Sequence, residues 1–250
     1  MDDISITQEG AEGSGYQRAF AFVREQLLTG KLKTGDRLLP EREFAARLGV
    51  SRPVIREVLR ALAAIGVIDI RHGQGSVVRV PDFSQMGDLF TLLLAQQGDV
   101  IDDIVQARIA IERQAIRLAC SRATSADIAR LDAGLRTIRE TTSDPVKGGE
   151  ADFHFHADLV EAAHSPTLSS LYVAISNLLR RSHMERRERI TDVPGIDSYL
   201  VDHHRLILTA IVERDADKAD HLLAQHFEIG SDFQRRALMA GLGGGQAGEP

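Results

Sequence analysis

One break between two helical stretches constrains the fold of this chain more than any other feature. The stretch "PEREFAARLGV" opens with Pro40 and closes at Gly49, a residue favoured just past the end of a helix. Ser51 then suits the N-cap of a second helix, with Pro53 in its first turn, where proline is tolerated. Two helices joined by so short a turn predict a helix-turn-helix.

The helix after this break has two different faces. Between Arg52 and about Ile65, the pattern predicts burial of Ile55, Val58, Leu59 and Leu62, while arginines recur every four residues. A further helix is expected over 16–28, and "VIDIRHGQGSVVRV" reads as a β-hairpin around a glycine-containing turn. The block therefore predicts a winged helix-turn-helix.

Charge is divided unevenly along the chain. Residues 16–80 carry 12 Lys and Arg against 6 Asp and Glu, whereas residues 81–250 carry 18 against 26, and the whole chain has a formal charge of −6. An arginine face on a short helix suits the major groove of DNA, where arginine pairs with guanine or clamps phosphate. A merely solvated face is the alternative, but the charge division, the helix spacing and the wing together favour DNA.

Composition limits the remaining possibilities. The single cysteine, Cys120, excludes an internal disulfide and suits a reducing compartment. No apolar run approaches the roughly 18 residues of a membrane span, and residues 1–15 have no signal-peptide pattern and look disordered. We expect a cytoplasmic protein without membrane contact.

The rest of the chain reads as helix. We expect a linker and first connecting helix over 81–95, an all-helical domain over 96–237 and a flexible tail over 238–250. Predicted helices lie at 84–97, 100–121, 125–142, 149–164, 166–190, 196–213 and 216–240. The predicted fold is mainly α, a winged helix-turn-helix with a small hairpin followed by an all-α bundle.

Histidines and one aspartate indicate a metal site in this bundle. Asp152 and His156 are spaced i, i+4, and they share a face with apolar residues. His204 and His226 lie eleven residues on either side of a predicted turn at Asp215, so an antiparallel helix pair would bring them level. Four inward-facing donors favour a divalent metal ion over four separate core or surface polar residues. His203 is the main rival of His204, and His154 lies at the wrong azimuth.

The N-terminal block resembles the DNA-binding domain of GntR-type bacterial transcription regulators. The resemblance rests on "LPERE", "GVSRPVIREVLRAL" and "RHGQGS". It implies that Arg42, Arg52 and Arg56 contact DNA and that His72 and Gly73 of the wing enter the minor groove. Arg60, further along the helix, is expected to touch phosphate or nothing.

Residues from about 85 to 237 resemble the all-helical FCD effector domain of the FadR subfamily. The family pattern of DxxxH, a histidine before an arginine and a later histidine matches Asp152, His156, His204 and His226. The resemblance implies a divalent ion, often zinc or nickel, with positions open to an effector carboxylate. One departure is His164 in "EAAHSP", where the family often has Asn; we expect it to cap a turn without changing the metal.

Arginines in the bundle raise a separate question. Arg108 lies within an apolar stripe, and an inward arginine needs an anion. A structural salt bridge to Glu112 is one explanation, and the FCD resemblance favours an effector carboxylate. A second cluster is expected to form a solvated helix face, with Arg181 as the member able to turn inward: Arg180, Arg181, Arg186, Arg187 and Arg189.

These observations predict a homodimeric transcription regulator, with repression as the favoured sign. It binds a palindromic double-stranded DNA operator and responds to a small organic acid at the metal site. The rival hypothesis is a metal-dependent hydrolase fused to a DNA-binding module. Against the rival, no general base is evident, because Asp158 and Glu161 point elsewhere on their helix. A third reading makes the metal purely structural.

Overall fold

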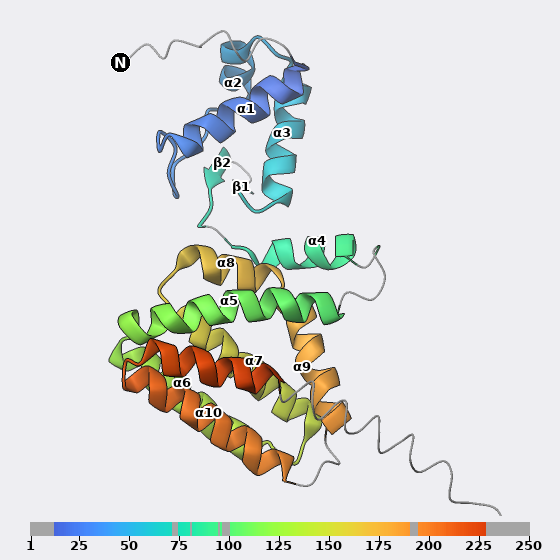
Figure 1. Cartoon of the computed structure of the whole chain (residues 1–250). Coiled ribbons are helices and arrows are strands. Elements are labelled where there is room, and N and C mark those ends of the chain that lie inside the picture. The colour runs from blue at the N-terminus through green and yellow to red at the C-terminus, as the bar shows by residue number, and fades with distance from the viewer. Residues whose placement is uncertain are drawn as a thin grey trace, which may run out of the picture. The chain divides into compact units, whose positions relative to one another are not determined.

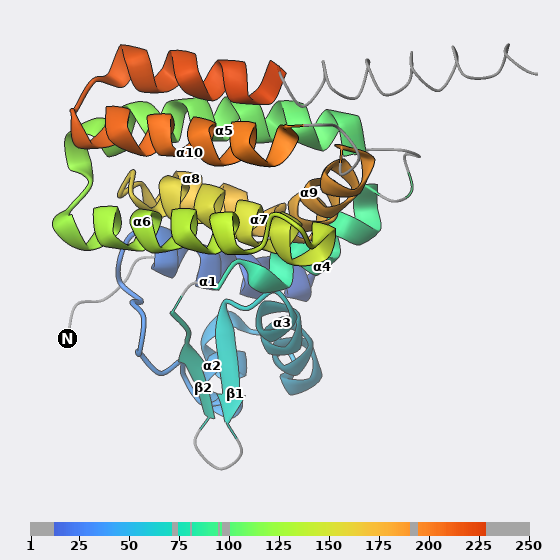
Figure 2. The ribbon, with the colours of Figure 1, turned by 90° about the horizontal axis from the view of Figure 1, so that it is seen from below.

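The computed structural model describes residues 13–71, 75–80, 82–94, 96, 101–190 and 195–228. The chain forms two compact units that divide between Met86 and Gly87. The described part confirms the predicted fold class, because it contains helices and one two-stranded antiparallel hairpin (Figures 1 and 2). None of the described helices is both long and apolar enough to span a membrane.

The N-terminal unit has the predicted order of helix, helix, turn, helix and hairpin. Its elements are α1 (Gly15–Leu28), α2 (Glu41–Leu48), α3 (Arg52–Ala64), β1 (Ile68–Arg71) and β2 (Gly75–Val78). Gly49 ends α2 in the left-handed conformation, at φ 61°, and lets the chain turn sharply into α3. The strands pair from Ile68 opposite Val78 to Arg71 opposite Gly75.

The predicted inward face of α3 is confirmed. Ile55, Val58, Leu59 and Leu62 are all buried, and they pack with Val23 of α1 in one apolar cluster. Ser51 occupies the N-cap position as expected, although its side chain makes no capping hydrogen bond. The arginines of α3 are left on the exposed side of the helix.

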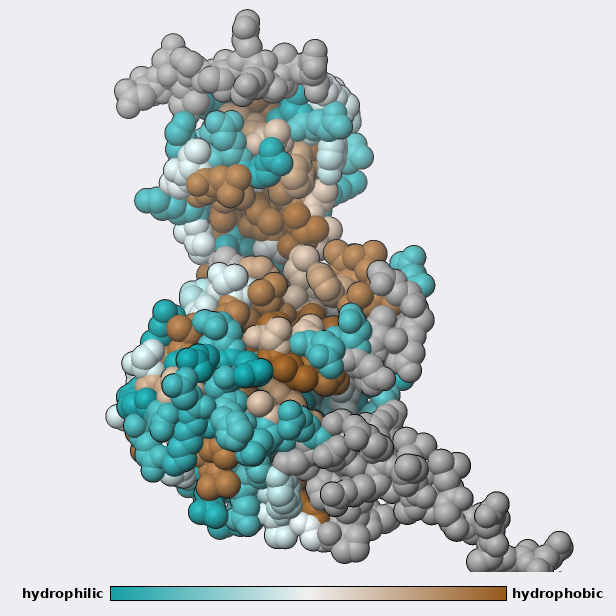
Figure 3. Space-filling model, viewed as in Figure 1, coloured by the Kyte–Doolittle hydropathy of each residue, from teal (hydrophilic) through white to brown (hydrophobic). Residues whose placement is uncertain are grey.

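The second unit is a helical bundle. Its elements are α4 (Ser84–Leu94), α5 (Ile101–Arg122), α6 (Ser125–Glu140), α7 (Pro145–Glu161), α8 (Pro166–Ala174), α9 (Ser176–Ile190), α10 (Ile196–Val212) and a last helix over residues 216–228. Its core draws on α5 to α10 and the last helix. By contrast, α4 exposes four large apolar side chains, Leu89, Phe90, Leu92 and Leu93, and hydrophobic surface gathers over it (Figure 3).

Two predicted helices differ from the structure. The single helix expected over 166–190 is wrong, because the chain breaks at Ile175 between α8 and α9. No glycine or proline marks this break; Tyr172, Ile175 and Leu178 are buried around it, so packing rather than local propensity decides it. In turn, α7 begins at Pro145 instead of 149, because Asp144 caps the amides of residues 146 and 147.

A pair of glycines that reads as a breaker instead brings two helices together. Gly148 and Gly149 lie inside α7 and face α9. A Cβ at Gly149 would lie 3.0 Å from the Cα of Met184, and one at Gly148 would lie 3.0 Å from Nε of Arg187. A Cβ at either position would be tighter than most real Cβ contacts, so glycine favours this close approach of α9 to the part of α7 that carries Asp152.

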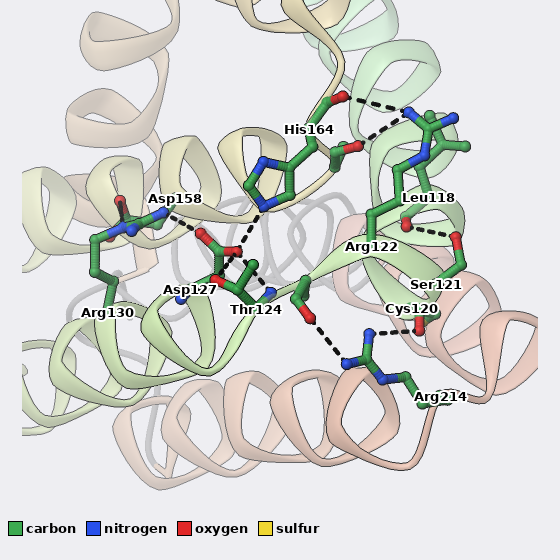
Figure 4. Close-up of polar contacts among 12 residues, drawn as sticks. Leu118, Cys120, Ser121, Arg122, Thr124, Asp127, Arg130, Asp158, His164 and Arg214 are labelled. Carbon is green, nitrogen blue, oxygen red and sulfur yellow. Dashed lines mark hydrogen bonds and ion pairs between the residues drawn. The ribbon is translucent and has the colours of Figure 1, made fainter.

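A polar network holds the junction of α5, α6 and α7 (Figure 4). Thr124 and Asp127 form a capping box at the start of α6, and Asp127 also accepts a hydrogen bond from Nε2 of His164 at 2.7 Å. His164 has a φ of 46°, so it occupies a left-handed turn position. Arg122 donates to the carbonyls of Ala163 and His164. His164 therefore belongs to a turn and lies outside the cluster of candidate metal ligands.

Asp127 should stabilise the bundle in a pH-dependent way. Burial alone would raise the pKa of Asp127, but hydrogen bonds from Thr124 and His164 outweigh it and hold the pKa well below its usual range. A depressed folded pKa contributes stability that is complete above the unfolded pKa of about 4 and is lost as the pH falls below it. We expect Asp127→Ala to lower the free energy of unfolding by about 1–2 kcal/mol at pH 7, and the gap to wild type to narrow towards pH 3.

Urea unfolding of the full chain at several pH values measures this effect. Asp132→Ala is the matched control, because Asp132 lies in the same helix and pairs with Arg136 on the surface. Equal losses in both variants, or a gap that does not change with pH, would contradict the assignment.

Candidate metal centre and nucleic-acid interface

Four side chains from three helices converge in the second unit. Asp152 and His156 come from α7, His204 from α10 and His226 from the last helix. One potential ligand atom from each lies within 4.8 Å of the others, and this is the cluster of such donors found among the described residues. All three histidines are buried.

The helix geometry that the sequence predicts brings these residues together. Asp152 and His156 share a face of α7 at the expected i, i+4 spacing. The turn at Asp215 reverses the chain between α10 and the last helix, where Asp215 accepts a hydrogen bond from the amide of Lys218. The rings of His204 and His226 then lie with their centroids 4.6 Å apart, as the antiparallel pairing predicts.

Hydrogen bonds outside the cluster orient two of the rings. His156 donates from Nδ1 to Oε2 of Glu112 at 2.6 Å, and His204 donates from Nδ1 to the carbonyl of Leu200 at 2.7 Å. Nε2 of each ring then faces the cluster, and in the neutral form of the ring this atom carries the lone pair. Such outer partners are the usual means of fixing the tautomer of a metal-binding histidine.

The converging atoms need a cation between them. Nε2 of His204 lies 2.8 Å from Oδ1 of Asp152, and Nε2 of His156 lies 3.3 Å from Nε2 of His226. A lone pair held against a carboxylate oxygen, or against another lone pair, is repulsive unless a positive charge lies between the two atoms. Imidazole nitrogens and a carboxylate oxygen form a donor set that suits zinc and nickel.

The electrostatic environment disfavours protons as that cation. Burial lowers the pKa of His156, although Glu112 partly opposes the effect. Burial also holds the pKa of His226 well below its usual range, and His204 and His156 lower it further. Burial alone would raise the pKa of Asp152, but His183 outweighs it, so that pKa lies well below its usual range. Asp152, His156 and His226 therefore favour their unprotonated forms, the forms in which these groups bind a metal ion.

Arg108 is buried beside this cluster and forms an ion pair with Glu112, which is one of the two explanations that the sequence offers for an inward-facing arginine. Its Nε donates to Oε1 of Glu112 at 2.7 Å, and the hydroxyl of Tyr172 donates to the same oxygen at 3.0 Å. Its guanidinium carbon lies 4.9 Å from the centroid of the Phe227 ring. Arg108 and His156 outweigh the effect of burial and lower the pKa of Glu112 to about 2. Nη2 of Arg108 is buried without a hydrogen-bond partner.

Two residues of α9 join the site, although the sequence pattern predicts Arg186 on a solvated face and assigns no role to His183. His183 is buried, and its Nδ1 lies 2.5 Å from Oδ2 of Asp152, while Nη2 of Arg186 lies 3.6 Å from the same oxygen. Burial and the nearby Arg108 lower the pKa of His183 to about 3. A signal exists in the sequence, since His183 and Arg186 are spaced i, i+3.

The expected solvated arginine face of α9 is partly wrong. Arg187 is 7% exposed, because it donates to the carbonyl of Thr142 and pairs with Asp197, and Arg186 turns towards Asp152. Arg181, the inward candidate, is 70% exposed and pairs with Glu185. Arg180 pairs with Glu150 on the surface. The side chain of Arg189 lies outside the described residues.

The two rival histidines lie outside the cluster. His203 is largely buried, but its ring stacks on Tyr199 with centroids 4.7 Å apart. His154 is exposed and pairs with Glu150. The register of α10 therefore brings His204, rather than His203, to Asp152.

The DNA-contacting candidates lie on the surface of the first unit. The side chains of Arg52 and Arg56 on α3 are 59% and 50% exposed. Arg42 is exposed on α2. Glu41 links the two helices, because its carboxylate accepts hydrogen bonds from Nε and Nη2 of Arg56 and lies 3.9 Å from Nη2 of Arg52. His72 and Gly73 lie outside the described residues.

Comparison with known proteins covers both units. Residues 15–78 match the family "Bacterial regulatory proteins, gntR family", and residues 103–229 match the FCD domain. The chain is 32% identical over 211 residues to a putative L-lactate dehydrogenase operon regulatory protein of Escherichia coli. The aligned region covers 83% of this chain and 81% of that protein. The chain is 28% identical over 200 residues to the galactonate operon transcriptional repressor of the same species, across 78% and 86% of the two chains.

A solved structure agrees with the fold. The GntR protein of Streptococcus agalactiae superposes with a TM-score of 0.63 at 22% identity, across 87% of this chain and 99% of that one. This likeness concerns the fold alone.

The register of α10 makes a testable distinction between neighbouring histidines. We expect His204→Ala to lower the affinity for Zn²⁺ or Ni²⁺ by at least about 100-fold, since even the outer-shell partners of a metal site are typically worth 10–100-fold. His203→Ala should retain the wild-type affinity, because its ring stacks on Tyr199 away from Asp152. Elemental analysis after dialysis, together with calorimetric titration, measures both. The ligand set is refuted if the two variants retain equal metal.

Proposed function

The chain is a member of the gntR family of bacterial regulatory proteins with an FCD domain, and we propose that it is a metal-dependent, acid-responsive repressor acting as a homodimer. The donor cluster of Asp152, His156, His204 and His226 carries this proposal, because it lies beside a buried arginine in the effector domain.

The regulator class itself is established by the comparisons. The curated relatives are named as regulators of operons, and the matched DNA-binding domain covers the helix-turn-helix and the hairpin. The chain is therefore a DNA-binding transcription regulator and not an enzyme, which sets aside the metal-dependent hydrolase.

The partner of α3 is double-stranded operator DNA. Exposed arginines on α3 and the net positive charge of residues 16–80 support this assignment. Arg52 and Arg56 lie in the first half of α3, where the recognition helix of a helix-turn-helix reaches base edges. The wing, with His72 and Gly73, adds a minor-groove contact.

A second copy of the chain covers the apolar face of α4. Leu89, Phe90, Leu92 and Leu93 expose apolar surface on one helix, and contiguous exposed apolar patches mark interaction sites. Asp88 accepts a hydrogen bond from the side-chain amide of Asn177, which attaches α4 to α9 of the second unit. A two-fold symmetric dimer supplies two copies of the reading helix, which matches a palindromic operator.

The effector is a small organic acid. The second unit is acidic overall, so an anion needs local positive charge. Arg108 and Arg186 are the cations of the chain beside the site, each already facing a carboxylate, and a divalent ion held by Asp152, His156, His204 and His226 would add the excess positive charge that a carboxylate needs. The unpartnered Nη2 of Arg108 is a buried donor suited to that carboxylate. The names of the relatives, which mention L-lactate and galactonate, are consistent with this class.

Acid binding releases the operator. By linkage, an acid that weakens DNA binding must itself bind less tightly to the DNA-bound protein, by the same factor. The factor for one effector is typically 5-fold to 150-fold.

Base reading by α3 can be separated from phosphate contact. We expect Arg52→Ala to weaken binding to an operator selected from a random duplex library by about 1–3 kcal/mol and to relax its sequence preference. Arg60→Ala, on the same exposed side of α3, should weaken all sequences alike and reduce the salt dependence, if it has any effect. Gel-shift titrations at fixed salt measure both. Unchanged specific binding by Arg52→Ala would rule out its role.

Acid recognition by Arg108 can be tested without removing its charge. Arg108→Lys keeps a cation beside Glu112 but lacks Nη2. The probe is the acid that most raises the melting temperature of the metal-loaded wild type. We expect this acid to bind the Arg108→Lys variant at least about tenfold more weakly than it binds the wild type. Arg113→Lys, on the surface of the same helix, is the control. The same acid should lower operator affinity. The proposal fails if the acid raises the melting temperature equally in the wild type, in the Arg108→Lys variant and in the metal-free protein.

A further inference from the structure

Two polar atoms beside the Asp152 carboxylate are buried without a hydrogen-bond partner and come from different helices. One is Nη2 of Arg108 on α5, and the other is Nε2 of His183 on α9. Both side chains are almost completely buried, at 1% exposure each. Buried polar atoms in native proteins are nearly always satisfied. The rings of His204 and His226 also carry an orphaned nitrogen, but they belong to the metal-donor cluster, whereas Arg108 and His183 do not, so the atoms of these two side chains indicate a ligand other than the metal ion.

The two orphaned atoms have opposite hydrogen-bonding character. The guanidinium can only donate. His183 faces the Asp152 carboxylate with Nδ1, and a carboxylate accepts hydrogen bonds, so Nδ1 carries the hydrogen. In that tautomer, Nε2 of His183 is an acceptor. The ligand must therefore accept from Arg108 and donate to His183.

Packing fixes the orientation of His183. The edge of its ring meets Phe153, with centroids 5.8 Å apart, and its centroid lies 5.5 Å from that of His156. Phe153 is itself buried under the guanidinium of Arg180. The close approach of α7 and α9 at Gly149 leaves the helix little freedom to move His183 away.

We propose that His183 is a specificity-determining residue that accepts a hydrogen bond from a hydroxyl group of the effector, so that the protein selects hydroxy acids over the corresponding keto acids. The inference rests on the proposed acid-binding function and deepens it. The carboxylate of the acid accepts from Nη2 of Arg108, and its hydroxyl donates to Nε2 of His183.

A keto acid meets one of these demands and not the other. Its carboxylate still accepts from Arg108, but its oxo group has no hydrogen to donate, and it sets a second acceptor against Nε2 of His183. A site built to hydrogen-bond a hydroxyl rejects an analogue without one far more strongly than an apolar site can. We expect a hydroxy acid to bind at least about tenfold more tightly than its keto partner.

The test compares matched pairs of acids on the full-length, metal-loaded protein. The probes are lactate with pyruvate, glycolate with glyoxylate, and 2-hydroxyglutarate with 2-oxoglutarate, titrated by calorimetry after a melting screen. His183→Asn is the main variant, because its side-chain amide can still donate to Asp152 while the Nε2 atom is gone. His203→Asn is the matched control, since His203 is also a largely buried histidine with an unpartnered ring nitrogen, yet it lies outside the cluster.

The expected result is a change in selectivity and not only in affinity. Wild type and His203→Asn should prefer the hydroxy acid of the bound pair by at least about tenfold, and His183→Asn should reduce the preference to about twofold or less with its metal content unchanged. A general loss of folding would weaken both acids of a pair equally and leave their ratio as it was.

Three other outcomes overturn the inference. It fails alone if acids bind the wild type without preference for the hydroxyl, or if His183→Asn keeps the wild-type preference. If no acid of any pair binds the metal-loaded wild type, the proposed acid-binding function fails, and the inference fails with it. Metal content, measured in every sample, separates that case from a protein that has lost its ion.

Discussion

The carboxylate of Asp152 is the group on which the effector unit depends, because its two oxygens face two different sets of partners. Oδ1 faces Nε2 of His204 at 2.8 Å and belongs to the donor cluster, whereas Oδ2 accepts from His183 and lies 3.6 Å from Arg186. A buried carboxylate is costly without positive or donating partners on every side. The same group therefore helps to hold α7, α9 and α10 together, beside the apolar core that these helices share.

The same site explains why some of its members follow from the sequence and others do not. Asp152 and His156 are one helical turn apart, and His204 and His226 are equally distant from the turn at Asp215, so local periodicity is enough to align them. Glu112, His183 and Arg186 lie on helices whose rotation depends on contacts far away in the chain. For α9 that contact is with Gly148 and Gly149. In the sequence these two glycines look like a helix break, but in the structure they lie inside α7 and let α9 pack closely against it. Site residues that are brought together by tertiary packing are harder to predict from the sequence than site residues that are aligned by their spacing along a helix.

The N-terminal unit was more predictable for a related reason. Its helix-turn-helix and hairpin are set by local features, such as the left-handed Gly49 and the alternating faces of α3, and these appear directly in the order of residues. The role of Glu41 was not evident in the same way. Its carboxylate pairs with Arg56 across the gap between α2 and α3, and an exposed ion pair of this kind contributes little stability.

Charge balance in the effector unit connects the metal ion to the effector. Among the buried groups around the cluster, the guanidiniums of Arg108 and Arg186 are matched by the carboxylates of Glu112 and Asp152. Without a bound cation these four charges cancel, and an organic acid entering an otherwise acidic domain gains little. A divalent ion at the donor cluster leaves an excess of positive charge in a buried site, where electrostatic interactions are only weakly screened. A bound metal ion should therefore raise the affinity of the protein for the acid. By linkage, the bound acid should raise the affinity for the metal ion by the same factor.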